Sequence, residues 1–176
     1  ERGFSTDVYE RSLAQILDCV ERHNGQTCQA IRCLFVPITD KESCTSMIER
    51  IIKEKALGAE PLQENIKVMF EDNIVLKDVP FSPLIRVYFY TDIKEVFHYL
   101  RNNPYGLSLN IFSERNVEEL LSEYGFYRCG RLLINSDPSI VNVREPWGGL
   151  GFSGSHGVSD WFRKFVDKTF FKHSKS

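Results

Sequence analysis

The run His23-Asn24-Gly25-Gln26-Thr27-Cys28 contains the side chain best suited to covalent chemistry. A thiol that follows a glycine turn can present its sulfur to a cleft without a neighbouring side chain blocking the approach. The thiolate is the attacking species, and a free cysteine is only roughly a few per cent thiolate at pH 7. Nearby backbone N–H groups, a cation or a base must therefore raise the thiolate fraction if Cys28 is to act as a nucleophile.

A second run, residues 146–155, is rich in glycine and hydroxyl side chains. The pair Gly148-Gly149 allows the backbone to approach a neighbouring strand or a ligand closely. Trp147 and Phe152 are suited to lining an apolar tunnel, although burial in the core explains them equally well. His23, beside the first run, could raise the thiolate fraction, although a solvent-facing histidine at a helix end is the simpler interpretation. Residue type alone leaves both interpretations open.

The composition limits the classes of protein and of partner. The 176 residues are 42% hydrophobic and 26% charged, with a net charge of −2, which is typical of one globular domain spanning 1–176. This charge gives no electrostatic reason to expect nucleic acid as a partner, and no apolar run is long enough to span a membrane. The five cysteines match no zinc-binding pattern and suggest free thiols in a reducing compartment. We therefore expect a cytoplasmic location, with the mitochondrial matrix also compatible.

Hydrophobic periodicity and turn residues predict strands that alternate with helices. The expected helices span residues 8–23, 41–57, 92–101, 116–124 and 157–166. The expected strands span residues 31–36, 67–70, 74–76, 84–90, 107–112, 131–134 and 168–172. This order predicts an α/β fold with a mostly parallel, doubly wound sheet, flanking helices and a C-terminal edge strand. Asn135, at a strand end, is expected to hold a loop through side-chain hydrogen bonds.

Four features follow one another along the chain in a fixed order. They are Gly25-Gln26-Thr27-Cys28, Asn103-Pro104-Tyr105-Gly106-Leu107, Gly130 to Asn135, and Pro146-Trp147-Gly148-Gly149 with Ser153-Gly154. In this order they resemble the catalytic, cysteine-bearing domain of the aldehyde dehydrogenase superfamily, over about residues 7–171. Cys-x-Ala-x-Arg-x-Leu from Cys28, and Gly-Gly-x-Gly-x-Ser-Gly-Ser from Gly148, are similar to the glutamate-semialdehyde (pyrroline-carboxylate) dehydrogenase branch.

The resemblance implies an oxidoreductase mechanism. Cys28 would attack an aldehyde to give a thiohemiacetal, its backbone N–H would donate to the oxyanion, and hydride would pass to NAD or NADP to leave a thioester. The residues that would bind the aldehyde substrate are Trp147, Phe152, Ser153, Gly154 and Ser155. In the glutamate-semialdehyde branch the serines and the glycine would hold the substrate carboxylate.

The sequence departs from the family pattern in several places. The family's general base, a Glu in a Glu-Leu-Gly-Gly run, has no counterpart, and Val79 stands where a ribose-binding Glu is expected. The stretch between Val36 and Val79 is shorter than in the family, and the resemblance covers only the catalytic domain, whereas the family's dinucleotide site lies mostly in a separate nucleotide-binding domain. We therefore expect either a fragment of a longer protein or a reduced member of the superfamily, which would need a nucleotide-binding domain or subunit as partner.

Two other functions compete with the enzyme hypothesis. The departures fit a non-catalytic domain with an assembly or binding role, and the strand Lys168–Phe171 resembles the family's C-terminal strand that joins a partner subunit in a homo-oligomer. A thiol hydrolase would need a histidine beside Cys28. The candidates are His23, His98, His156 and His173.

Overall fold

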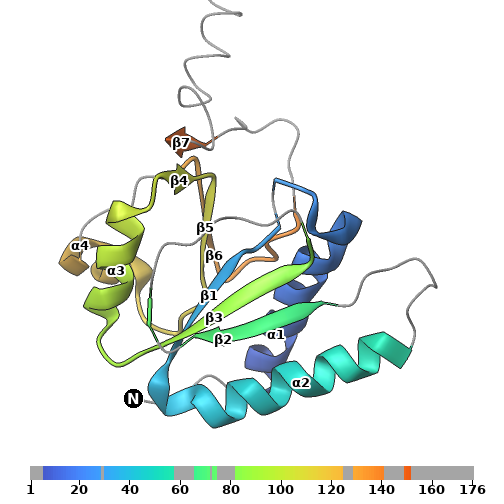
Figure 1. Cartoon of the computed structure of the whole chain (residues 1–176). Coiled ribbons are helices and arrows are strands. Elements are labelled where there is room, and N and C mark those ends of the chain that lie inside the picture. The colour runs from blue at the N-terminus through green and yellow to red at the C-terminus, as the bar shows by residue number, and fades with distance from the viewer. Residues whose placement is uncertain are drawn as a thin grey trace, which may run out of the picture.

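A computed structural model of the chain describes residues 6–28, 30–57, 66–71, 73–74, 82–124, 129–140 and 149–151. Its centre is a three-stranded parallel sheet (Figure 1). Strand β3 (Leu84–Tyr90) lies between β1 (Cys33–Pro37) and β2 (Lys67–Glu71). Leu34 of β1 and Phe70 of β2 both pair with Val87, which fixes the register of the three strands.

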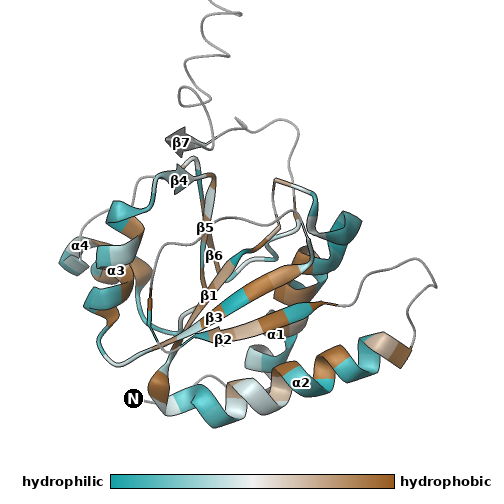
Figure 2. Ribbon diagram, in the orientation of Figure 1, coloured by the Kyte–Doolittle hydropathy of each residue, from teal (hydrophilic) through white to brown (hydrophobic). Residues whose placement is uncertain are grey.

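Side chains alternate between the two faces of this sheet, as the period of a strand requires. One face packs against α1 (Thr6–Glu21) and α2 (Lys41–Leu57). The sheet residues in this core are Leu34, Val36, Val68, Ile85, Val87 and Phe89. The other face carries Phe35, Tyr88 and Tyr90 and packs against α3 (Ile93–Asn102). Figure 2 shows hydrophobic residues along these central strands and alternating hydrophobic and hydrophilic residues along α2.

A second parallel pair extends the α/β arrangement. Strand β5 (Ser108–Ile111) pairs with β6 (Arg131–Ile134), and α4 (Val117–Tyr124) packs with α3 beside them. The start of α3 is fixed by a capping box, in which Asp92 and Glu95 satisfy backbone N–H groups of the first turn. Val96, Phe97 and Leu100 are buried, so one face of α3 packs into the core.

Two details differ from the sequence prediction. Ile74 belongs to no strand and packs in a loop against the Val96 and Leu100 cluster, so the expected strand at 74–76 is wrong at its first residue. A short antiparallel pair, β4 (Tyr105–Gly106) with β7 (Leu150–Gly151), was not expected. A two-residue strand is too short for an alternating pattern, so only its partner reveals it.

Three predicted elements or boundaries need separate mention. The first helix ends at Glu21 and continues as a 3-10 turn, Arg22–Gly25, instead of ending at residue 23. The expected helix at 157–166 and the edge strand at 168–172 lie outside the described residues. No helix among the described ranges has the length and apolarity needed to cross a membrane.

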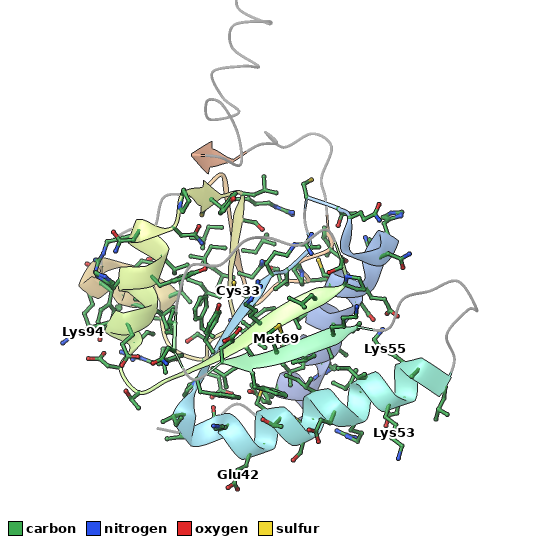
Figure 3. All side chains as sticks on the ribbon, in the orientation of Figure 1. Cys33, Glu42, Lys53, Lys55, Met69 and Lys94 are labelled. Atoms are coloured by element: carbon green, nitrogen blue, oxygen red, sulfur yellow. The ribbon has the colours of Figure 1, made fainter. Side chains whose placement is uncertain are left out.

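One ion-pair cluster joins the two helices on the same face of the sheet. The Lys55 ammonium at the end of α2 donates to the carboxylates of Asp18 and Glu21 on α1, the latter at 2.9 Å. Figure 3 shows Lys55 on the side of α2 that faces the protein, whereas Lys53 points into solvent. Burial alone would lower the pKa of Lys55. The hydrogen bonds that its ammonium donates to both carboxylates outweigh this effect and raise that pKa.

We predict that Lys55→Met lowers the free energy of unfolding at pH 7 by about 1 kcal/mol, because the partly exposed pair is screened by solvent. A raised pKa means that the contribution is complete below the ordinary lysine value of 10.5 and is lost as pH rises through the higher folded value. Urea unfolding at pH 7 and above pH 11 measures this. Lys53→Met is the matched control, and an equal loss in both variants would contradict the prediction.

Candidate functional site

The Cys28 turn, residues 23–28 with Ala30, follows α1 and has an unusual backbone. Three consecutive residues adopt left-handed conformations, with φ of 52° at His23, 53° at Asn24 and 69° at Gly25. The turn is then closed by hydrogen bonds from the Gln26 N–H to the His23 carbonyl at 3.1 Å and from the Ala30 N–H to the Thr27 carbonyl at 3.2 Å. The thiol of Cys28 is exposed at this turn.

Gly25 is the position in this turn that requires glycine. Its φ lies in the left-handed region, which favours glycine because glycine has no Cβ. A Cβ on Gly25 would also overlap the carbonyl of Ser82 and approach the nitrogen of Pro83. The backbone of the turn therefore lies directly against the segment that leads into β3, and no larger residue fits there.

Arg32 joins the same two segments with its side chain. The guanidinium donates from Nη1 to the Ser82 carbonyl at 2.9 Å and from Nη2 to the Gly25 carbonyl. Its own carbonyl accepts from the Arg86 N–H at 2.9 Å, so the main chain is tied to β3 as well. Sequence analysis placed Arg32 only in a family-like motif. Its bridging role was not predicted, because both acceptors are backbone carbonyls and the identity of a residue does not reveal what its carbonyl accepts.

The five cysteines differ sharply in environment. Cys28 is exposed, whereas Cys19 and Cys44 are buried and Cys33 and Cys129 are partly buried. Burial raises the pKa of each of the other four thiols, because it disfavours the charged thiolate. The Asp137 carboxylate adds to the rise at Cys19. The exposed thiol is therefore the one that a reagent reaches without opening the core.

The second, third and fourth sequence features meet at the β4–β7 pair. Tyr105 and Gly106 pair with Gly151 and Leu150, and the Gly130 N–H donates to the Gly106 carbonyl at 2.9 Å. Segments that lie far apart in the sequence therefore meet at this pair. Figure 1 shows this pair at the same end of the molecule as the connection from α1 to β1.

Asn135 has the structural role that the sequence favoured. Its side-chain oxygen accepts from the Ser113 N–H and its side-chain nitrogen donates to the Ser113 carbonyl, both at 2.8 Å. Its own φ of 48° is left-handed, a conformation that asparagine tolerates better than most residues. Asn135 therefore fastens the end of β6 to the end of β5.

Several predicted site residues cannot be placed relative to Cys28. Trp147, Phe152, Ser153, Gly154 and Ser155 lie outside the described residues, as do Val79, His156 and His173. His23 is exposed within the turn itself. His98 lies on α3, where its ring nitrogen is 3.2 Å from the amide nitrogen of Asn102. Among the described residues, no hydrogen bond joins a histidine to the Cys28 thiol, so none of them is identified as its base.

The described strand-to-helix turns do not fit a dinucleotide. A pyrophosphate site needs a glycine-rich turn and free N–H groups at a helix N-terminus. The turn before α2 is Pro37 followed by the 3-10 segment Ile38–Asp40, which contains no glycine and ends in a carboxylate. The N-terminus of α3 is already occupied by the Asp92 carboxylate. The residues described here therefore offer no evident place for NAD or NADP.

Comparison with curated proteins places these observations in a family context. No protein-family model matches the chain. It is 28% identical over 138 residues to the alpha-ketoglutaric semialdehyde dehydrogenase of Bacillus subtilis, a match that covers 68% of this chain and 28% of that protein. It is 34% identical over 84 residues to the N-succinylglutamate 5-semialdehyde dehydrogenase of Escherichia fergusonii, covering 47% of this chain and 16% of that protein. The chain thus spans less than a third of these relatives.

Solved structures show the same fold. The NADP-dependent glyceraldehyde-3-phosphate dehydrogenase of Bacillus halodurans, complexed with NADP, superposes with a TM-score of 0.69 at 17% identity, covering 87% of this chain and 41% of that one. Aldehyde dehydrogenase 21 of Physcomitrella patens, in complex with succinate, gives 0.65 at 17% identity, covering 85% and 40%. The predicted α/β fold is confirmed, and so is the resemblance to aldehyde dehydrogenases, which the chain shares in sequence with the curated relatives and in fold with the solved structures.

Proposed function

We propose that this chain is the catalytic domain of an aldehyde dehydrogenase-like oxidoreductase, with Cys28 as its nucleophile. The observation that carries the proposal is the exposure of Cys28 on a tightly anchored turn, while the other four thiols are withdrawn from solvent. The relatives named above are aldehyde dehydrogenases, which supports an aldehyde as the substrate.

The proposed step is addition of the Cys28 sulfur to the aldehyde carbon. A carbon–sulfur bond forms, the π electrons of the carbonyl move to oxygen, and that oxygen takes a proton to give a thiohemiacetal. Nothing is oxidised in this step. The developing oxyanion needs a donor placed in advance, and the backbone N–H of Cys28 is the candidate by resemblance.

Oxidation to the thioester requires a hydride acceptor. We propose NAD or NADP for this role, because one neighbouring structure is named as NADP-dependent and contains NADP. The described turns do not fit the dinucleotide, so a nucleotide-binding domain or subunit would have to hold it. The proposal for the residues described here therefore stops at the thiohemiacetal.

We propose a semialdehyde that carries a carboxylate as the substrate class. Both curated relatives are named for such substrates. Ser153, Gly154 and Ser155 are the residues that we expect to hold the carboxylate, through hydroxyl and backbone N–H groups. These residues lie outside the described ranges, so the support comes from the names of the relatives and from the sequence resemblance.

The alternative of a non-catalytic assembly domain gains no support from the described residues. Its motivation lies in the missing general base, the shortened stretch between Val36 and Val79, Val79 itself and the strand Lys168–Phe171, and the last two fall outside the described residues. A homo-oligomer formed through that strand stays a prediction. Size-exclusion chromatography with light scattering, before and after removal of residues 168–176, is the measurement that checks it.

We predict that iodoacetamide modifies Cys28 at least about tenfold faster than any other cysteine at pH 7, because the other thiols are shielded and burial keeps them protonated. Since their pKa values are raised, their modification should become appreciable only above the ordinary thiol value of about 8.5. Peptide mapping by mass spectrometry measures the five rates, with Cys28→Ser as the control. Comparable modification of Cys19 or Cys44 at pH 7 would contradict the prediction.

We further predict that succinic semialdehyde slows this alkylation, because a thiohemiacetal removes the free thiolate. Propanal should protect less at equal concentration, since it lacks the carboxylate, and 1-propanol should not protect at all. The protection should be reversed by dialysis. Equal alkylation rates with and without both aldehydes would argue against Cys28 as an aldehyde-reactive nucleophile, and equal protection by the two would argue against the carboxylate preference.

A further inference from the structure

The left-handed run in the Cys28 turn is costly for two of its three residues. His23 and Asn24 have a Cβ that disfavours positive φ, and although histidine and asparagine tolerate it better than most residues, each still costs up to about 1 kcal/mol. Such a conformation persists only where the surrounding structure fixes it. Its position immediately before the proposed nucleophile makes the fixing contacts part of the site.

Two contacts fix the turn, and both involve the carbonyl of Ser82. The backbone of Gly25 packs against this carbonyl so closely that a Cβ cannot be accommodated. The Arg32 guanidinium then bridges the Ser82 carbonyl and the Gly25 carbonyl. Ser82 is itself held, because its carbonyl also accepts from the Leu84 N–H at 2.7 Å at the start of β3.

Arginine is the side chain suited to this bridge. Its planar guanidinium offers several N–H donors in fixed directions, so it can serve two carbonyl oxygens on different segments at once. The ammonium of lysine is a compact point charge on a flexible stem and lacks this geometry. Arg32 is partly buried where it makes these contacts, and this burial lowers the pKa of its guanidinium.

We propose that Arg32 is a positioning residue for Cys28. It holds the strained turn that follows α1 against Ser82, just before β3, in the conformation that presents the thiol. The positioning of the turn stands on the contacts above, and its consequence for aldehyde addition rests on the proposed function of Cys28. Arg32 touches neither the thiol nor a substrate in this role.

The test compares Arg32→Lys and Arg32→Ala with the control Arg101→Lys. Arg101 also donates from its guanidinium to a backbone carbonyl, that of Tyr124, at 2.9 Å, but it does so at the end of α3. Hydrogen exchange of the Gln26 and Ala30 amides reports on the turn, and peptide mapping reports the alkylation rate of each cysteine. Arg32→Ala is also measured with guanidinium chloride below its denaturing concentration, against sodium chloride at the same ionic strength.

We expect both amides to exchange about tenfold faster in the Arg32 variants, because the charge-assisted hydrogen bonds that anchor the turn to Ser82 are lost. Cys28 should be alkylated faster and protected less by succinic semialdehyde, while Cys19 and Cys44 stay unmodified. Guanidinium should partly restore the slow exchange in Arg32→Ala. The control should leave all three measurements unchanged.

Three outcomes would overturn the proposal. Unchanged exchange at Gln26 and Ala30 would show that Arg32 does not hold the turn. Equal acceleration at Cys19 and Cys44, or variants that do not fold, would show a general stabilising role instead. If wild-type Cys28 is not protected by either aldehyde, yet the variants still loosen the turn selectively, the proposed function fails while the positioning of the turn survives.

Discussion

The structure depends on the burial of β3 between two layers of helix. Ile85, Val87 and Tyr88 are at most 1% exposed, so both faces of this strand are removed from water. Apolar burial of this extent is the largest favourable contribution that a strand makes to folding. Because β3 is held on both faces, the segment that leads into it is held as well. Ser82, in this segment, therefore provides a fixed backbone carbonyl for the Cys28 turn.

The Cys28 turn packs against this carbonyl of Ser82. Gly25 lies against the Ser82 carbonyl, and Arg32 bridges the same carbonyl to the Gly25 carbonyl. The exposed thiol is therefore carried by a turn that is anchored to a buried strand, although Cys28 itself lies outside the core. This arrangement separates the roles of the cysteines, since Cys19 and Cys44 fill space in the core while Cys28 is free to react.

Much of the fold could be predicted from the sequence because its elements have strong local signals. Leu84–Tyr90 and Arg131–Ile134 were predicted to the residue, and the helix expected to begin at Asp92 has Asp92 as the residue that caps its first turn. The β4–β7 pair could not be predicted, since two-residue strands exist only through their partners. At the site, the glycine and the cysteine in the sequence predicted the turn. The bridge from Arg32 could not be predicted, because its acceptors are backbone carbonyl oxygens, which every residue has.

The central claim is that Cys28 adds to an aldehyde. Carbon-13 NMR with succinic semialdehyde labelled at the aldehyde carbon tests it most directly, because addition converts a trigonal carbon into a tetrahedral one bonded to sulfur. The wild-type chain should give a protein-bound thiohemiacetal signal that is absent in Cys28→Ser. The claim is contradicted if the wild-type chain gives no such signal, or if Cys28→Ser gives the same one.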